Sequence, residues 1–306
     1  MTAFLLRRLA QTVPIALLVA TLVFSLIHLI PGDPVEMMLG EGAQRSQVEA
    51  LRHDLGLDRP LATQYLSFLT GLVRADLGMS LHFREPVIEI LVRHYPATLE
   101  LTMASMVVAL LVSIPLGVLA ASHRNRFLDH VSRVVALVGV SIPNFWLGPM
   151  LILLFAIQLD WFPVSGRTGW LSLVLPAVTL GTALSGILTR MVRSSVAEEL
   201  EKPYMMAALA RGLRRGSVLR IHALKNASIP VVTIIGLQFG ALLTGAIITE
   251  TIFSWPGLGR LVIQAIRLRD YPLVQGSILA IALTYLVINL ITDVVYAMLD
   301  PRIRVS

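Results

Sequence analysis

The chain has 306 residues, of which 56% are hydrophobic and 14% are charged, and its mean hydropathy is +0.76. These values exclude an ordinary water-soluble domain and indicate a membrane protein. The 25 Lys and Arg against 19 Asp and Glu give a net charge of +6, but these cations lie in short segments between apolar runs, which argues against nucleic-acid binding. With no cysteine and only scattered histidines, the sequence predicts no metal site.

Six apolar stretches are long enough to cross a bilayer, which requires roughly 20 mostly apolar residues in a helix. They predict an all-α membrane protein with six transmembrane helices, at residues 9–30, 98–121, 134–157, 171–188, 229–249 and 277–299. The first stretch follows Arg7 and Arg8, as in a signal peptide, but it is too long for one and no cleavage pattern follows it.

The distribution of Lys and Arg predicts which way these helices cross. If both termini are cytoplasmic, the inner segments hold fifteen cations and five acids, whereas the outer segments hold ten cations and twelve acids. Cytoplasmic segments of membrane proteins carry the excess of Lys and Arg, so we expect the N- and C-termini to be cytoplasmic.

The long outer segment, residues 31–97, is predicted to form short packed helices. Ser46-Gln47-Val48-Glu49 is typical of a capping box, Gly56 suits a helix end, and Pro60 and Pro86 suit first helical positions. An apolar face at helical spacing is expected to pack against the protein or the membrane surface, with partner docking as the alternative. This face comprises Leu61, Tyr65, Phe68, Leu69 and Leu72.

Close helix packing and bends are also expected within the apolar stretches. Gly236 and Gly240 form a Gly-x-x-x-Gly motif, which is typical of close helix–helix contact. Prolines in the predicted spans are interpreted as bends that fit neighbouring helices, or that shape a cavity: Pro115, Pro143, Pro149 and Pro176. The polar residues in or beside the spans leave the substrate pathway unassigned: Asn144, Gln238, Thr244 and Asn289.

Motifs for catalysis or for nucleotide binding are missing from the sequence. A phosphate-binding loop needs a lysine after a glycine, and neither Lys202 nor Lys225 follows one. We therefore expect no catalytic residue in this chain and, if ATP drives it, a separate ATP-binding chain. Glu100 and Asp293 lie within predicted spans, where we interpret them as helix contacts rather than as a proton relay.

The inner segment 189–228 carries the strongest local pattern. Three acids at 198, 199 and 201 precede Pro203, and Gly212 can end a helix in the left-handed conformation, so a short helix is predicted over 203–212. One face of this helix is expected to hold Tyr204, Ala207, Ala208 and Arg211. A second helix, capped by Ser217, is predicted over 218–226.

Two interpretations of this segment differ in what it contacts. A basic loop can rest on anionic lipid headgroups, but such a helix normally displays large apolar residues. The small Ala207 and Ala208 favour a helix that enters a groove in another protein.

Seven motifs, in order along the chain, carry a resemblance to a known family. The sequence resembles the inner-membrane permease subunits of binding-protein-dependent ABC importers, in their dipeptide, oligopeptide and nickel branch. The motifs are Pro-Gly-Asp-Pro at 31–34, Leu-Gly-Leu-Asp-Arg-Pro at 55–60, Asp-Leu-Gly-Met-Ser at 76–80, Pro-Ala-Thr-Leu-Glu-Leu at 96–101, Ser-Ile-Pro-Asn-Phe at 141–145, Glu-Thr-Ile-Phe-Ser-Trp-Pro-Gly-Leu-Gly at 250–259 and Leu-Asp-Pro-Arg at 299–302.

The resemblance implies a role for the inner segment as the family's coupling helix, inserted in a cleft of the ATPase subunit. Ala207, Ala208 and Gly212 match the family's Glu-Ala-Ala-x-x-x-Gly pattern, whereas Met206 replaces its Glu. The implied coupling residues are Pro203, Tyr204, Ala207, Ala208, Arg211 and Gly212. The residues implied at the periplasmic, receptor-facing side are Glu250, Phe253, Trp255, Pro256 and Gly257.

The implied fold is that of a type I ABC importer permease in the bacterial inner membrane. It comprises a single domain over 1–306, with a first span at 1–30, a periplasmic helical loop at 31–97, a five-span core at 98–299 that includes the cytoplasmic loop 189–228, and a tail at 300–306.

The resemblance also implies partners and a mechanism. A second homologous permease, two ABC ATPases that bind ATP and Mg²⁺, and a periplasmic or lipid-anchored solute-binding protein would work with this chain, surrounded by membrane lipid. Transport of dipeptides or oligopeptides by alternating access is implied, with nickel complexes or glutathione-type solutes as alternatives. A gradient-driven secondary transporter and a membrane scaffold remain as other classes.

Overall fold

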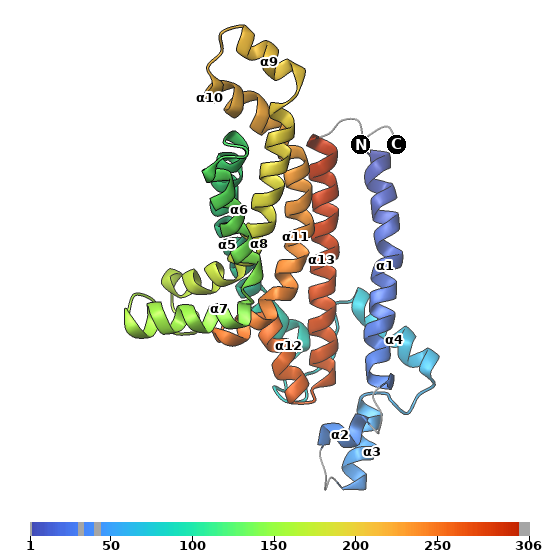
Figure 1. Cartoon of the computed structure of the whole chain (residues 1–306). Helices are drawn as coiled ribbons and strands as arrows, with labels where there is room; N and C mark the ends of the chain where they lie inside the picture. The colour runs from blue at the N-terminus through green and yellow to red at the C-terminus, as the bar shows by residue number, and fades with distance from the viewer. Residues whose placement is uncertain (1, 30–33, 40–43, 300–306) are drawn as a thin grey trace. The chain divides into compact units, whose positions relative to one another are not determined.

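The computed structural model describes residues 2–29, 34–39 and 44–299 (Figure 1). Its elements are helices, and the only β-bridge among the described residues joins Met79 to Pro86. The predicted all-α fold is therefore confirmed. Most of the Pro-Gly-Asp-Pro motif at 31–34 and the tail at 300–306 lie outside the described residues.

The helices follow one another in a simple order. They are α1 (Thr2–Leu29), α2 (Pro34–Leu39), α3 (Arg45–Asp54), α4 (Leu61–Val73), α5 (Val87–Ser122), α6 (Phe127–Ser141), α7 (Asn144–Leu151), the π-helix η1 (Ile152–Gln158), α8 (Trp170–Leu200), α9 (Pro203–Ala210), α10 (Arg215–Ser217), the π-helix η2 (Val218–Ala223), α11 (Leu224–Ile252), α12 (Leu258–Arg267) and α13 (Tyr271–Leu299).

The chain divides into two compact units. Among the described residues, one unit contains those of Leu99–Trp255 and 288–299, and the other contains those of Thr2–Thr98 and Pro256–Val287. The boundaries fall inside α5 and α13 and just after α11. This division differs from the predicted five-span core at 98–299, because Pro256–Val287 packs with the N-terminal residues.

Helices of membrane-spanning length recur through the fully described part of the chain. Four qualify by length and composition, at Arg7–Leu29, Val87–Ser122, Trp170–Leu200 and Tyr271–Val295. A bent pair, Phe127–Ser141 with Asn144–Gln158, makes a fifth if it counts as one span. The 29-residue helix α11 covers the predicted span at 229–249, although some of its side chains are not described. A multi-pass membrane protein is therefore confirmed, and six spans remain a prediction.

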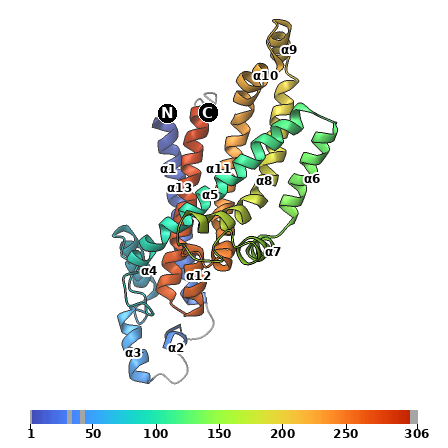
Figure 2. The ribbon, with the colours of Figure 1, turned by 90° about the vertical axis from the view of Figure 1, so that its left-hand side faces the viewer.

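The predicted span at 134–157 is not one straight helix. α6 and α7 meet at an angle of 97° (Figure 2). The bend lies at Ile142 and Pro143, whose ψ angles of 117° and 140° are extended. Proline disfavours the helical conformation of the residue before it, which explains why α6 ends here.

The outer segment begins its helices slightly differently from the prediction. The prediction of a capping box that begins at Ser46 is wrong, because α3 starts at Arg45. The Gln47 side chain instead accepts a 3.1 Å hydrogen bond from the Gln44 backbone N–H. Pro60 and Pro86 each lie one residue before a helix rather than inside its first turn. Gly56 ends α3 with a φ of +65°, as predicted.

The apolar face of α4 packs against α1 within the same unit. The ring of Phe24 lies 5.2 Å from Tyr65 and 5.7 Å from Phe68, and the Tyr65 hydroxyl is 2.7 Å from Thr21 Oγ1. Packing against the protein is thus confirmed for Tyr65 and Phe68. Leu61 is 60% exposed and does not take part.

Helix α11 approaches α13 closely at the first glycine of the Gly-x-x-x-Gly motif. A Cβ at Gly236 would lie 2.0 Å from Thr292 Cγ2, which is closer than non-bonded carbon atoms approach each other. The close helix contact predicted for Gly236 is therefore confirmed.

Replacing Gly236 by alanine is expected to destabilise the protein by about 1–3 kcal/mol, because the added methyl overpacks this contact. The measurement is thermal unfolding of the detergent-solubilised chain. Gly216→Ala is the control, since nothing lies within 4 Å of a Cβ there. Equal melting temperatures for the two variants would contradict the close contact.

Candidate functional site

Helix α9 projects beyond the paired ends of α8 and α11 (Figures 1 and 2). It spans Pro203–Ala210, within the predicted stretch 203–212. The Leu213 N–H donates to the Ala208 carbonyl, and Gly212 has a φ of +83°. Glycine enters this left-handed region without the steric cost of a Cβ, so Gly212 ends the projection where the sequence indicates.

One side of α9 is exposed and the other is not. Pro203, Ala207 and Ala210 are exposed, and Met206 is 63% exposed. We call these four residues the exposed α9 face. Of the other predicted coupling residues, Arg211 and Gly212 are exposed, Tyr204 is 40% exposed, and Ala208 is partly buried. The exposed α9 face is therefore shifted by about one residue along the sequence from the predicted face.

Met205 anchors the buried side of α9. It is 1% exposed and packs against Val218 and Ala223, with Ala208 at the edge of the same cluster. This cluster joins α9 to η2, the π-helix that leads into α11. Met205 was not predicted from the sequence, although an apolar pair at positions 205 and 208 could have indicated a buried side.

Polar contacts add a second anchor at the end of α8. Glu199, which is 8% exposed, accepts hydrogen bonds from Lys202 and from the Tyr204 hydroxyl. Asn226 Nδ2 of α11 donates to the same hydroxyl over 2.8 Å. Tyr204 thus uses its polar end to connect α8, α9 and α11.

The protonation of Lys202 and Tyr204 preserves this network near neutral pH. The hydrogen bond to Glu199 raises the pKa of Lys202 above its usual value. Burial, and then the hydrogen bond to Glu199, raises the pKa of Tyr204. Raised pKa values favour the protonated forms, so both donors keep their protons until the solution is strongly alkaline.

The predicted separate helix over 218–226 is wrong. Ser217 has helical angles of −70° and −42° and makes no capping hydrogen bond. The chain instead runs from η2 directly into α11, with Pro230 inside that helix. Because no break separates them, the base of the projection is continuous with a long helix.

The predicted receptor-facing residues do not form a surface in this structure. Glu250, Phe253 and Trp255 are at most 1% exposed, Gly257 is buried, and Pro256 is partly buried. The Trp255 N–H donates to the Glu250 carbonyl over 2.8 Å, which turns the chain back at the end of α11. This turn directs the aromatic side chains into the core, where Phe253 packs against Ala156 and Leu175.

Glu100 takes part in an ion pair near this turn. Arg167 Nε donates to its carboxylate over 2.8 Å, and the same guanidinium lies 6.0 Å from the Trp255 ring centroid. The interpretation of Glu100 as a structural contact agrees with this pairing.

Solved structures with a similar fold are membrane transporters. A chain of the MetNI methionine ABC transporter in an inward-facing conformation has a TM-score of 0.57 and 19% identity, covering 70% of this chain and 97% of that one. A second match, to an amino acid ABC transporter with histidines, has a TM-score of 0.51 and 17% identity, covering 70% and 94%. The fold is therefore that of the membrane-spanning chains of type I ABC importers.

Sequence relatives narrow this class. A family model described as the inner membrane component of binding-protein-dependent transport systems matches residues 113–305, and the model for its N-terminal part matches residues 1–102. The chain is 44% identical to the dipeptide transport system permease protein DppB of Escherichia coli (strain K12) and 41% identical to the glutathione transport system permease protein GsiC of Salmonella typhi, over 99% of each chain. It belongs to this family of ABC importer permeases.

Replacing Met205 by alanine is expected to destabilise the base of α9 by about 2–5 kcal/mol, because it leaves a cavity in the cluster. Hydrogen exchange of the amides over 203–224 should become faster. The matched control is Met206→Ala, at an exposed position, which should change stability by less than about 0.5 kcal/mol. If the two variants exchange alike, Met205 does not anchor the helix.

Proposed function

We propose that this chain is the membrane-spanning permease subunit of an ATP-driven importer that moves dipeptides or oligopeptides into the cell. Family membership supports the permease role. The names of relatives that share over 40% identity along 99% of their length support a peptide substrate. Glutathione is itself a peptide and falls within this substrate class. Nickel complexes are the alternative substrate.

The observation that carries the proposal is helix α9, which is exposed on one side and anchored by Met205 on the other. This sequence has no phosphate-binding loop, so the energy of ATP hydrolysis has to arrive from another chain. The exposed α9 face is small at Ala207 and Ala210, which allows close approach of another protein's groove. Met205 and Glu199 hold the helix to α8 and α11, so that a push on α9 displaces those long helices rather than α9 alone.

Partners and orientation follow from this role. We propose that α9 and both termini lie in the cytoplasm, in agreement with the excess of Lys and Arg in the inner segments. Two ABC ATPases would bind ATP and Mg²⁺, and they would also bind α9. A second homologous permease would complete the pathway, and a periplasmic or lipid-anchored solute-binding protein would deliver the peptide. The chain itself would carry no cofactor and hydrolyse nothing.

Coupling through α9 is tested by Ala207→Glu, which places a charge in the middle of the exposed face. ATPase copurification and peptide uptake should each fall at least roughly tenfold, as expected when a central interface contact is lost. Membrane insertion should not change, because the Ala207 side chain is exposed. Thr63→Glu, at an exposed position of α4, is the control. Undiminished ATPase binding by Ala207→Glu would refute the assigned face.

The energy source is tested with the complete importer in sealed vesicles. Uptake of a labelled dipeptide should require ATP and should persist in the presence of an ionophore, because no ion gradient drives it. The ion pair of Glu100 with Arg167 favours this outcome. A carboxylate that relays protons has to be free to bind and release a proton during transport. Uptake that continues without ATP and collapses with the ionophore would identify a secondary transporter instead.

A further inference from the structure

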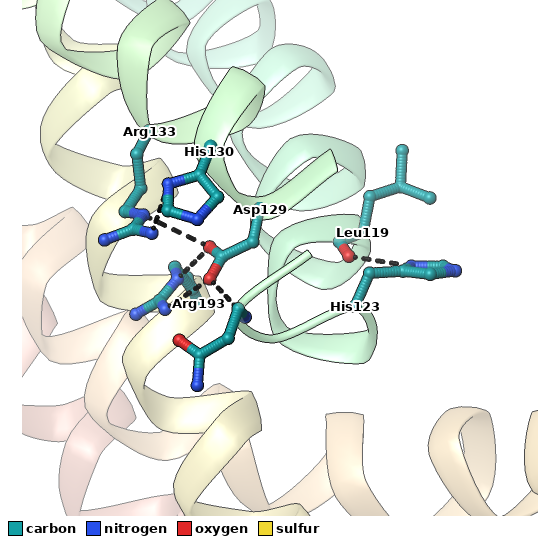
Figure 3. Close-up of polar contacts among 7 residues, drawn as sticks. Leu119, His123, Asp129, His130, Arg133 and Arg193 are labelled. Carbon is teal, nitrogen blue, oxygen red and sulfur yellow. Dashed lines mark hydrogen bonds and ion pairs between the residues drawn. The ribbon is translucent and has the colours of Figure 1, made fainter. Parts of the chain in front are cut away.

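The buried ion pair between Asp129 and Arg193 joins α6 to α8 (Figure 3). Arg193 Nε donates to Asp129 Oδ1 over 2.6 Å, and Arg193 Nη2 donates to Oδ2 over 2.9 Å. The carboxylate is fully buried, whereas the arginine side chain is 23% exposed. Two parallel hydrogen bonds fix the relative position of the two side chains in a way that a single contact does not.

Neighbouring groups complete the environment of Asp129. The Asn125 backbone N–H donates to Oδ2 over 3.0 Å, and Arg133 Nε lies 3.4 Å from Oδ1. Arg133 also donates to His130 Nδ1 over 3.0 Å. Figure 3 shows that the guanidinium groups of Arg133 and Arg193 both lie beside the carboxylate. Because both oxygens have partners, the charge is held in a defined place.

The same register continues along the two helices. Ala136 lies seven residues after Asp129, and Gly186 lies seven residues before Arg193. A Cβ at Gly186 would lie 2.3 Å from the Ala136 carbonyl oxygen. This close contact keeps the helix axes near each other, but small residues alone resist sliding weakly. The ion pair adds a directional contact to this interface, because its two hydrogen bonds require one relative position of the two side chains.

The helices that the pair joins lead to opposite ends of the same unit. α8 runs without interruption to Leu200, just before α9, and Arg124 in the turn before α6 forms an ion pair with Glu201. α6 ends at the bend at Ile142 and Pro143. Beyond the bend, Gly148 of α7 packs against the side chain of Phe253. α8 reaches α7 directly, because Thr179 Cγ2 of α8 lies 3.5 Å from a Cβ at Gly148. A displacement of α9 reaches the bend at Ile142 and Pro143 through α6 only if α6 moves with α8.

We propose that Asp129 and Arg193 are positioning residues that lock α6 to α8, so that movement of α9 by an ATPase is transmitted to the bend and to α7. This inference rests on the proposed function. The pair touches no substrate and acts through the helices that it joins. Its loss leaves the ATPases attached and active, but it lets α8 move without α6.

The first test is the number of ATP molecules hydrolysed per peptide imported by the complete importer, normalised to the amount of assembled complex. Arg193→Lys keeps the charge but loses the two-bond geometry, and Asp129→Asn is a second, independent variant. Each should raise this ratio by roughly threefold to thirtyfold. ATPase copurification should stay at the wild-type level. Arg93→Gln, which breaks the exposed Arg93–Glu85 pair, is the matched control and should leave the ratio unchanged.

The second test measures the distance between α6 and α8 directly. The chain has no cysteine, so spin labels can be placed at Leu137→Cys and Arg190→Cys, two exposed positions on these helices. The wild-type pair should give one distance with and without a non-hydrolysable ATP analogue. Arg193→Lys should add a second distance when the analogue is bound.

Four results overturn the inference. A wild-type α6–α8 distance that changes with nucleotide excludes a lock, and so does an Arg193→Lys importer with normal ratio and a single distance. If both variants lose transport only in proportion to lost assembly, the pair is a folding contact alone. A wild-type complex without ATP-dependent uptake overturns the proposed function as well, which distinguishes the two failures.

Discussion

The packing of Met205 against Val218 and Ala223 is the contact on which the candidate site depends. An isolated helix of eight residues is not stable in water, because nucleating a helix costs more than so few hydrogen bonds return. α9 is a defined projection only because this cluster, together with the hydrogen bonds of Glu199, fixes one of its sides. Its other side is left exposed, and a helix held on one side can receive a push without unfolding.

Features set by local chemistry were predictable from the sequence. Pro203 and Gly212 delimit α9 through backbone geometry, and the apolar runs predicted long helices because a bilayer leaves few alternatives. The inward turn of the chain at 250–257 was not predictable, because the burial of the Trp255 side chain depends on neighbours distant in sequence. For the same reason the periodicity within 203–212 did not reveal that Ala208 faces inward, because periodicity groups residues on a face without saying which face is buried.

Prolines show why bends are harder to predict than helices. Pro143 ends α6, whereas Pro230 and Pro176 lie inside helices that continue past them. Proline removes one backbone hydrogen bond in each case, so the difference arises from the surroundings. At Pro143 the preceding Ile142 is extended and the chain turns by 97°, which gives α7 a direction of its own. The bend thus makes α7 an element separate from α6.

A buried ion pair such as Asp129 with Arg193 is a weak source of stability, because removing both charges from water cancels much of their attraction. An apolar contact would hold α6 and α8 together as well, as Gly186 and Ala136 do further along. Apolar contacts are not directional, whereas two hydrogen bonds to one carboxylate also fix the orientation of the partner side chain. A transporter that carries displacement over the length of α8 requires fixed register more than it requires adhesion, and this requirement accounts for a charged pair where a neutral one would suffice for folding.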